Sequence, residues 1–260
     1  MKKSAKISLV IILALLALIF VISTYRVTST IHEYNESDRY YQQARETVVK
    51  ENTSQTPSDE PAAVQKDPRT YSPVTVDFGA LQKDYPDIRG WLYAPGTEIN
   101  YPVVQGKDND FYLHRLMDGA DNAGGTLFMD YRNGADFSSK HTLIYGHHMK
   151  DGSMFAALVN YADQAYYDEH PYLFLNTPNG NYRLDVVAGF VTLDDSRAYL
   201  LDFKSRAEFD EWYELMSSFS DFTSDVSFGP DDLIVTLSTC TYDYDNARYV
   251  LMTKLVPLDD

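Results

Sequence analysis

The sequence predicts a mainly β domain, built as a sandwich or a barrel, behind an N-terminal segment of different character. Eight short runs of strand-like composition follow Val74, and residues typical of turns separate them. Aromatic residues make up 14% of the 260 residues, with 21 tyrosines, which is typical of a β-rich protein with many half-buried positions. Many strands at short spacing favour a sandwich or barrel over βαβ units.

The N-terminal segment begins with an almost wholly apolar stretch, residues 7–25, close to the ~20 residues that a membrane-spanning helix needs. Three lysines precede it and only Arg26 follows closely, so the positive-inside rule places residues 1–6 in the cytoplasm and the rest of the chain outside. A cleaved signal peptide is the alternative, because residues 21–23 resemble a cleavage site. We favour an uncleaved, single-pass anchor.

Residues 26–73 are expected to form an extracytoplasmic stalk and linker. Mixed charges with weak helical periodicity extend from His32 to Glu51, and a stretch rich in Ser, Thr, Pro and acidic residues follows as far as Pro73. One folded domain is then expected over residues 74–260. The net charge of −16 offers no basic face to a phosphate backbone, which argues against nucleic acid as a partner.

The eight predicted strands share short length, apolar composition and bounding turn residues. The turn Pro178-Asn179-Gly180 predicts a hairpin between the fifth and the sixth. In chain order the strands are IRGWLYAP from Ile88, INYPVVQ from Ile99, GTLFMDYR from Gly125, HTLIYGH from His141, YLFLNT from Tyr172, YRLDVVAGFVTL from Tyr182, DLIVTLSTC from Asp232 and RYVLMTKLV from Arg248.

Two helices are predicted between these strands. A short amphipathic helix should carry Met154, Phe155, Leu158 and Tyr161. The capping-box pattern that begins at Ser205 predicts a second helix, whose aromatic face we expect to point toward the core. That face consists of Phe209, Trp212, Tyr213, Met216 and Phe219.

The sequence contains one cysteine, Cys240, at the end of a predicted strand. A lone cysteine cannot form an intramolecular disulfide, and an exported free thiol is exposed to oxidation, which suggests a function for it. The alternative is a buried cysteine that serves as a small hydrophobic residue. Alternation along the strand places Cys240 and Ser238 on the more polar face, opposite the apolar face of Leu233, Val235 and Leu237.

Arg248 begins the next predicted strand after a loop of seven residues, so an antiparallel return would bring its guanidinium beside the thiol. There it could favour the thiolate and hold a carbonyl oxygen or a developing oxyanion. The alternative is a strand-end arginine that pairs with Asp243 or Asp245 in the same loop.

A cysteine nucleophile needs a partner that exchanges protons, and the best-placed of the six histidines are His147 and His148 at the end of the strand HTLIYGH. Gly146 precedes them and would allow close approach of another segment. Adjacent strand residues point to opposite sides, so only one of the two can face Cys240, which also argues against a two-histidine metal site. A structural zinc site is not expected either, because no second cysteine is present.

These elements in combination resemble a class B sortase. The resemblance rests on the N-terminal anchor, on GWLYAPGTEINYPVVQGKDNDFYLHR from Gly90, on YGHHMKDGSMF from Tyr145, and on TLSTC from Thr236 with an arginine opening the next strand. It covers nearly all of residues 75–256. The resemblance implies a closed eight-stranded sortase-type β-barrel with a few peripheral helices, in which the helix from Ser205 precedes the cysteine strand.

The resemblance also implies roles for individual residues. Cys240 would be the nucleophile, His147 the general acid and base, and Arg248 the group that positions the substrate carbonyl and stabilises the oxyanion. Substrate contacts are implied for Asn109, Leu113, Tyr145 and Ser238. No metal and no organic cofactor are implied.

The implied activity is that of a membrane-anchored cysteine transpeptidase of a Gram-positive bacterium. Such an enzyme cleaves a C-terminal sorting signal, NPQTN or a related NPxTx form, of an exported protein and transfers the acyl group to an amine of a peptidoglycan precursor. A pilin-polymerising sortase, with a pilin lysine as nucleophile, is the nearest alternative. A membrane-tethered surface binding module with an incidental thiol is the alternative from a different class.

Two other cysteine enzymes fit the sequence less well. In papain-like wall hydrolases the cysteine normally precedes the histidine, whereas here His147 precedes Cys240. An L,D-transpeptidase would carry its cysteine in a Ser-x-Gly-Cys context, which this sequence lacks.

Overall fold

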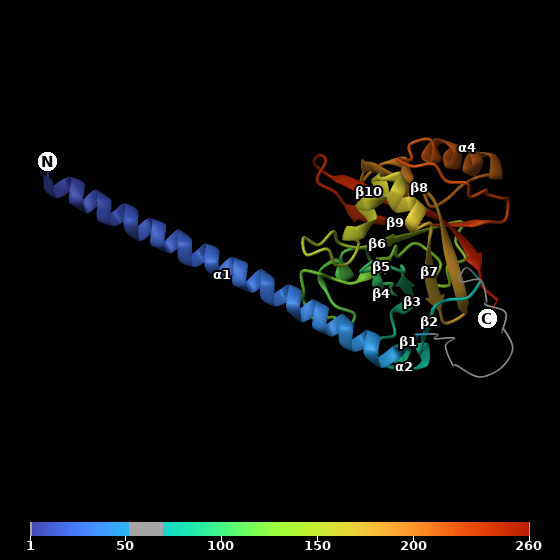
Figure 1. The fold of residues 1–260 in the computed structure, drawn as a ribbon, viewed down its shortest axis with the longest axis horizontal. Helices are drawn as coiled ribbons and strands as arrows, with labels where there is room; N and C mark the ends of the chain where they lie inside the picture. The colour runs from blue at the N-terminus through green and yellow to red at the C-terminus, as the bar shows by residue number, and fades with distance from the viewer. Residues whose placement is uncertain (1, 52–69, 260) are drawn as a thin grey trace.

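The structure is a computed structural model that describes residues 2–51 and 70–259, apart from the side chains of residues 2–7 and 10. The predicted linker from Asn52 to Pro73 therefore lies outside the described residues, except for residues 70–73. Figure 1 shows a β-rich body from which one long helix, α1 (Lys2–Val48), projects.

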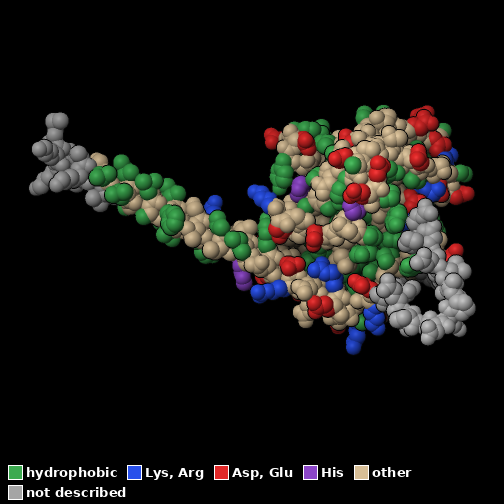
Figure 2. Space-filling model, viewed as in Figure 1, with side chains coloured by type: hydrophobic (Ala, Val, Ile, Leu, Met, Phe, Trp, Pro, Cys, Tyr) green, Lys and Arg blue, Asp and Glu red, His purple; other side chains and the backbone are tan. Residues whose placement is uncertain are grey.

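The projecting part of α1 carries the apolar stretch of the N-terminus. Hydrophobic side chains cover its surface in Figure 2, and Phe20 is 72% exposed. Among the described residues, α1 is the one helix long and apolar enough to cross a membrane. Exposed apolar surface of this extent indicates contact with lipid or with another protein.

All eight predicted strands are present, and they close into a barrel. They are β3 (Ile88–Tyr93), β4 (Asn100–Val104), β5 (Leu127–Met129), β6 (His141–Tyr145), β7 (Tyr172–Thr177), β8 (Gly180–Leu193), β9 (Leu233–Cys240) and β10 (Ala247–Pro257). Their order around the barrel is β10-β8-β7-β3-β4-β5-β6-β9. The predicted fold class is therefore confirmed, and closure leaves no strand edge free within the barrel.

Most neighbouring strands are antiparallel, but β4 with β5 and β6 with β9 are parallel. The hairpin predicted at Pro178-Asn179-Gly180 joins β7 to β8, where Thr177 pairs with Gly180. Parallel neighbours need long crossover connections, and most short helices of the fold lie on these. They are η1 (Phe111–His114), between β4 and β5, and η2 (Ala156–Ala162), α3 (Gln164–Glu169), η3 (Arg197–Tyr199) and α4 (Arg206–Ser217), between β6 and β9. A further helix, α2 (Phe78–Asp84), precedes β3.

The two faces of β9 show why the cysteine strand is almost wholly buried. Val235 and Leu237 point into the barrel core, as alternation predicted, whereas Ile234 packs outside it in a second cluster with Trp212 of α4. Figure 1 shows α4 lying over the barrel beside β8 and β9. The outer face of β9 is therefore covered at its start and becomes accessible only near Cys240.

The helix predicted from the capping box is α4. The Ser205 hydroxyl accepts a hydrogen bond from the Glu208 N–H at 3.2 Å, and Glu208 in turn accepts one from the Lys204 N–H at 2.6 Å. Phe209, Trp212 and Met216 are buried, as predicted. The prediction was wrong for Phe219, which is 53% exposed, because the helix ends at Ser217 and the helical periodicity no longer applies.

The segment expected to be a stalk continues α1 as far as the barrel and packs against it. Tyr41 is 1% exposed, and its hydroxyl donates to the Gly125 carbonyl at 2.6 Å. The strand β1 (Val49–Glu51) then pairs with β2 (Val74–Val76) in a small separate sheet. The end of α1 is therefore part of the folded body, whereas the predicted linker begins only after Glu51.

The predicted helix after the histidine pair forms as η2. Leu158 and Tyr161 are buried on it, while Met154 and Phe155 are buried just before it. The large apolar side chains from Met149 to Tyr161 thus belong to the same buried cluster as the barrel core, which fixes the position of the histidine loop.

Candidate active site

Cys240 and Arg248 face each other across the β9–β10 ladder. Their Cα atoms are register partners, so the antiparallel return of the chain predicted from the sequence is confirmed. Cys240 is partly exposed and carries a free thiol. The alternative of an inert core cysteine would require full burial, and the partial exposure of Cys240 argues against it.

Arg248 does not pair with the acidic residues of its own loop. One Nη lies 3.4 Å from the Asp194 carboxylate, in the loop after β8, and the other donates to the Ala247 carbonyl at 3.1 Å. The Asp194 contact is long and its carboxylate is 45% exposed, which makes it a weak ion pair. The guanidinium therefore keeps donors for a further partner.

The parallel pairing of β6 with β9 brings the histidine segment to the cysteine. Tyr145 is the register partner of Ser238, and the Gly146 N–H donates to the Ser238 carbonyl at 3.1 Å. A Cβ at Gly146 would lie 2.6 Å from Phe155 Cδ2, so only glycine fits this close approach. The prediction made for Gly146 is confirmed.

His147 is oriented by η1 on the opposite side of the pocket. Its Nε2 lies 2.6 Å from the Leu113 carbonyl oxygen, and its ring stacks on His114 with the ring centroids 5.6 Å apart. Since a carbonyl only accepts, Nε2 carries the proton and Nδ1 is the nitrogen that can accept one. Burial lowers the pKa of His147 despite the opposing effect of the Leu113 contact, so the ring is neutral near pH 7.

His148 takes a different place. Its Nδ1 lies 2.9 Å from the Cys240 carbonyl oxygen, and its ring lies beside Tyr242. The two histidines therefore divide as alternation predicted, with His147 in the pocket and His148 against the backbone of the cysteine. The sequence left open which of the two imidazoles faces the thiol, and the structure places His147 in the cavity with Cys240.

One cavity of about 410 Å³ joins these groups. All seven residues singled out from the sequence line it, although they come from four separate parts of the chain. They are Asn109, Leu113, Tyr145, His147, Ser238, Cys240 and Arg248. The cavity is more apolar than polar, which suits a peptide whose few polar groups are recognised individually.

Ser238 and Tyr199 form the wall next to the thiol. The two hydroxyls lie 2.8 Å apart, and the ring of Tyr199 is parallel to that of Tyr145 within 12°. Burial raises the pKa of Tyr199 to about 12, so its phenol is neutral. Together these residues provide two hydrogen-bonded hydroxyls beside a pair of stacked aromatic rings.

Asn109 and Tyr145 are both held by one buried carboxylate, Asp130, which follows β5. The Asn109 amide donates to Asp130 Oδ2 at 3.0 Å and the Tyr145 hydroxyl donates to the same oxygen at 2.9 Å. Arg132 neutralises this carboxylate through its Nε and one Nη. Two of the implied substrate contacts therefore share a single support.

Sequence reasoning missed several residues that line the cavity or support it, among them the charged residues Asp130, Arg132 and Asp194 and the phenol of Tyr199. The motif Asp-x-Arg directly after a strand was a usable signal for the first two, because such spacing allows a short ion pair. Asp194 and Tyr199 gave no signal, since their approach to Cys240 depends on how the chain after β8 folds back. No group of three or more His, Cys, Asp or Glu side chains among residues 2–51 and 70–259 is placed to hold a metal ion.

Comparison with known proteins identifies the family. A family model described as the Sortase domain matches residues 92–256. Sortase B of Listeria monocytogenes serovar 1/2a is 40% identical over 178 residues, which cover 68% of this chain and 72% of that protein. Sortase B of Staphylococcus aureus is 33% identical over 185 residues, covering 70% of this chain and 76% of that protein.

Solved structures agree with the sequence relatives. The Staphylococcus aureus sortase B–substrate complex has a TM-score of 0.67 at 33% identity, covering 70% of this chain and 85% of that one. Sortase B from Bacillus anthracis in complex with AAEK1 has a TM-score of 0.72 at 34% identity, covering 87% and 99%. The chain therefore belongs to the sortase family, in its class B branch, and is a cysteine transpeptidase.

Proposed function

We propose that Cys240 is the nucleophile of this transpeptidase, that His147 is its general acid and base, and that Arg248 stabilises the oxyanion. The observation that carries the proposal is the convergence of these side chains in one cavity, although they lie on three different strands or strand ends. The register pairing of Cys240 with Arg248 and the neutral, oriented imidazole of His147 support the roles.

The proposed reaction starts with proton transfer from the Cys240 thiol to Nδ1 of His147. The resulting thiolate attacks a threonine carbonyl of the sorting signal and forms a C–S bond. The imidazolium then gives its proton to the leaving amine as the C–N bond breaks, which leaves a thioester. An incoming amine attacks the thioester, forms a C–N bond and gives a proton to His147. The C–S bond then breaks, and the leaving sulfur takes that proton back from His147, which regenerates the thiol and the neutral imidazole.

Arg248 acts at the tetrahedral stages of both half-reactions. Its guanidinium has donors beyond those used by Ala247 and Asp194, and these would meet the negative oxygen that develops beside the thiol. Fixed donors aimed at developing charge in a partly dry site are usually the largest single contribution to catalysis.

The proposed acyl donor is an exported protein with an NPQTN-like or NPxTx sorting signal, and the proposed acceptor is an amine of a peptidoglycan precursor. A solved substrate complex of the Staphylococcus aureus relative supports binding of a substrate by this fold. A pilin lysine as the acceptor is the second candidate. The apolar part of α1 supports a membrane anchor, and the lysines before it support a cytoplasmic N-terminus with the catalytic domain, residues 74–260, outside.

The test uses the full-length chain in detergent with a labelled NPQTN peptide. We expect cleavage after the threonine and a mass-spectrometric acyl adduct on Cys240, neither of which should form with Cys240→Ala. Supplying a peptidoglycan-type amine or a lysine peptide then separates the two acceptors by the product that accumulates.

The adjacent histidines provide a matched pair for the assigned base. His147→Asn should lower turnover by about 10²–10⁴-fold, the usual contribution of general acid–base catalysis. His148→Asn should keep most of the activity, since His148 contacts only the backbone oxygen of Cys240 in the site. Equal losses in the two variants would argue against the assignment, and the absence of any peptide cleavage would refute the proposed substrate.

A further inference from the structure

Asp130 is a buried carboxylate with an unusually complete set of donors. Its side chain is 0% exposed. Oδ1 accepts from the Arg132 N–H at 3.0 Å and from Arg132 Nε at 2.8 Å. Oδ2 accepts from Arg132 Nη2 at 2.7 Å, from the Tyr145 hydroxyl at 2.9 Å and from Asn109 Nδ2 at 3.0 Å.

These donors keep the carboxylate charged. Burial alone would raise the pKa of Asp130, but the hydrogen bonds from Arg132, Asn109 and Tyr145 outweigh it and lower the pKa to about 2. The peptide group of Asp130 is fixed as well, because its carbonyl accepts from Gln105 Nε2 at 3.0 Å. The Asp130 carboxylate is therefore an ionised hydrogen-bond acceptor with a fixed position behind the cavity wall that Asn109 and Tyr145 form.

The contacts with Asp130 fix which hydrogen-bonding groups Tyr145 and Asn109 have left for a substrate. Tyr145 has a single O–H, and this is directed at Asp130, so its phenolic oxygen can only accept a further hydrogen bond. Asn109 Oδ1 accepts from the Tyr131 N–H at 3.1 Å, which sets the orientation of the amide. One N–H of Asn109 then remains available as a donor.

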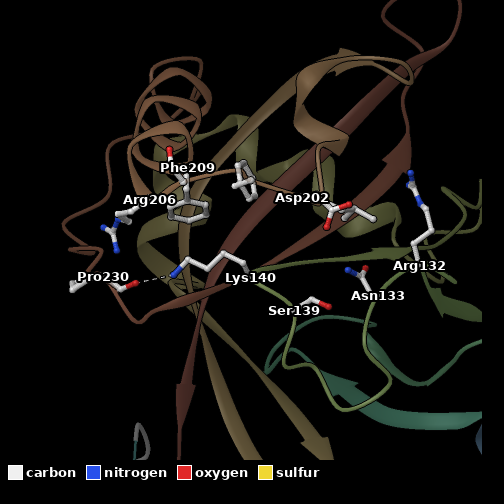
Figure 3. Close-up of a pocket in the computed structure, with 11 residues that line it drawn as sticks. Arg132, Asn133, Ser139, Lys140, Asp202, Arg206, Phe209 and Pro230 are labelled. Atoms are coloured by element: carbon white, nitrogen blue, oxygen red, sulfur yellow. Dashed lines mark hydrogen bonds between the residues drawn. The ribbon is translucent and has the colours of Figure 1, made fainter.

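An alternative role for Arg132 is to bind an anion in the neighbouring cavity, together with the other cations that line it. Figure 3 shows this cavity, of about 540 Å³, with Arg132 at one side and Lys140 and Arg206 at the other. Lys140 is already held by the carbonyls of Pro230 and Asp232, and Arg206 by the Asp210 carboxylate. Lys140, Arg206 and Arg132 each have a partner already, which argues against an anion site. We therefore assign Arg132 to the support of Asp130.

We propose that Asp130 is a positioning residue that makes this wall of the cavity selective for an amide group of the peptide substrate. Tyr145 presents an acceptor and Asn109 a donor, both adjacent to the same carboxylate oxygen, and an amide offers the complementary N–H and C=O. A carboxylate in place of a carboxamide has no N–H to donate to the Tyr145 oxygen, so it cannot complete this pair of hydrogen bonds. The inference rests on the proposed peptide substrate and specifies its chemistry.

The test compares Asp130→Asn with the parent on NPQTN and on the two peptides in which a carboxamide becomes a carboxylate, DPQTN and NPETN. The parent should prefer the amide over at least one acidic peptide by about 10- to 100-fold in kcat/KM, the usual discrimination of a hydrogen-bonding site. In Asp130→Asn, Tyr145 can turn its O–H toward the substrate and Arg132 loses its counter-ion. We expect that preference to shrink about tenfold, mainly through KM.

Two controls separate this role from a merely structural one. The rate at which iodoacetamide alkylates Cys240 should change less than about twofold in Asp130→Asn, because the thiol is not part of the network. Asp121→Asn removes the partner of Arg115 in a surface ion pair whose carboxylate is 85% exposed, and should alter neither rate nor preference. An unchanged peptide preference in folded Asp130→Asn would overturn the proposal.

An activity-independent measurement distinguishes failure of this inference from failure of the proposed substrate. In ¹³C-carboxyl NMR, Asp130 should titrate well below an ordinary aspartate, and Tyr145→Phe should raise its pKa by removing one donor. If no peptide is cleaved and this titration holds, the proposed substrate fails and with it the selectivity. An ordinary, Tyr145-independent titration refutes the positioning role even if peptides are cleaved.

Discussion

Replacing Arg248 with lysine separates catalysis from folding at a single position. The substitution keeps the positive charge but removes the planar fork of donors. The fork makes only a 3.4 Å contact with Asp194 and a 3.1 Å contact with the Ala247 carbonyl, so its contribution to folding should not exceed about 1 kcal/mol. Loss of an oxyanion donor costs about 2.7–4 kcal/mol in the transition state, a fall of about 10²–10³ in kcat.

The assay is single-turnover cleavage of the NPQTN peptide, with formation of the thioester on Cys240 followed by mass spectrometry. Arg248→Lys should slow both formation and resolution of the thioester, because an oxyanion forms in each half-reaction. Urea unfolding should show little change. Arg115→Lys is the matched control, since Arg115 forms a 3.1 Å pair with Asp121 on the surface. Near-normal turnover by Arg248→Lys would show that Arg248 is only a strand-end ion pair.

Two further predictions concern stability. Tyr41→Ala should lower the free energy of unfolding by about 3–5 kcal/mol, because it leaves a cavity, and Tyr41→Phe by about 1–3 kcal/mol, because it leaves the Gly125 carbonyl without its donor. Denaturant titration measures both changes. An unchanged free energy of unfolding in both variants would mean that the packing of α1 on the barrel does not stabilise the fold. Burial lowers the pKa of His141 to about 4, so the unfolded state binds more protons and stability should fall by about 3 kcal/mol as the pH drops from about 6.5 to about 4. His141→Gln should flatten this pH dependence in unfolding experiments at pH 7 and pH 4.5, and an equally steep loss would exclude His141 as its origin.

The regular part of the fold was predictable because it depends on local signals. Each strand has an apolar run bounded by turn residues, and the capping box at Ser205 marks the start of α4. The failures are also local in origin: periodicity was extended past the end of α4 to Phe219, and the mixed charges before Glu51 concealed a helix that buries Tyr41. A helix stabilised by packing on a distant surface has little signature in its own composition.

By itself the sequence determined the eight strands, the lone thiol at the end of one of them and the arginine opposite it, because antiparallel neighbours in sequence are neighbours in space. Only the tertiary structure decided which histidine enters the pocket, since the parallel contact of β6 with β9 joins segments about 90 residues apart. The same holds for Asp130, whose partners come from three parts of the chain. A buried charge is defined by all the groups that surround it, and closure of the barrel is what brings them together.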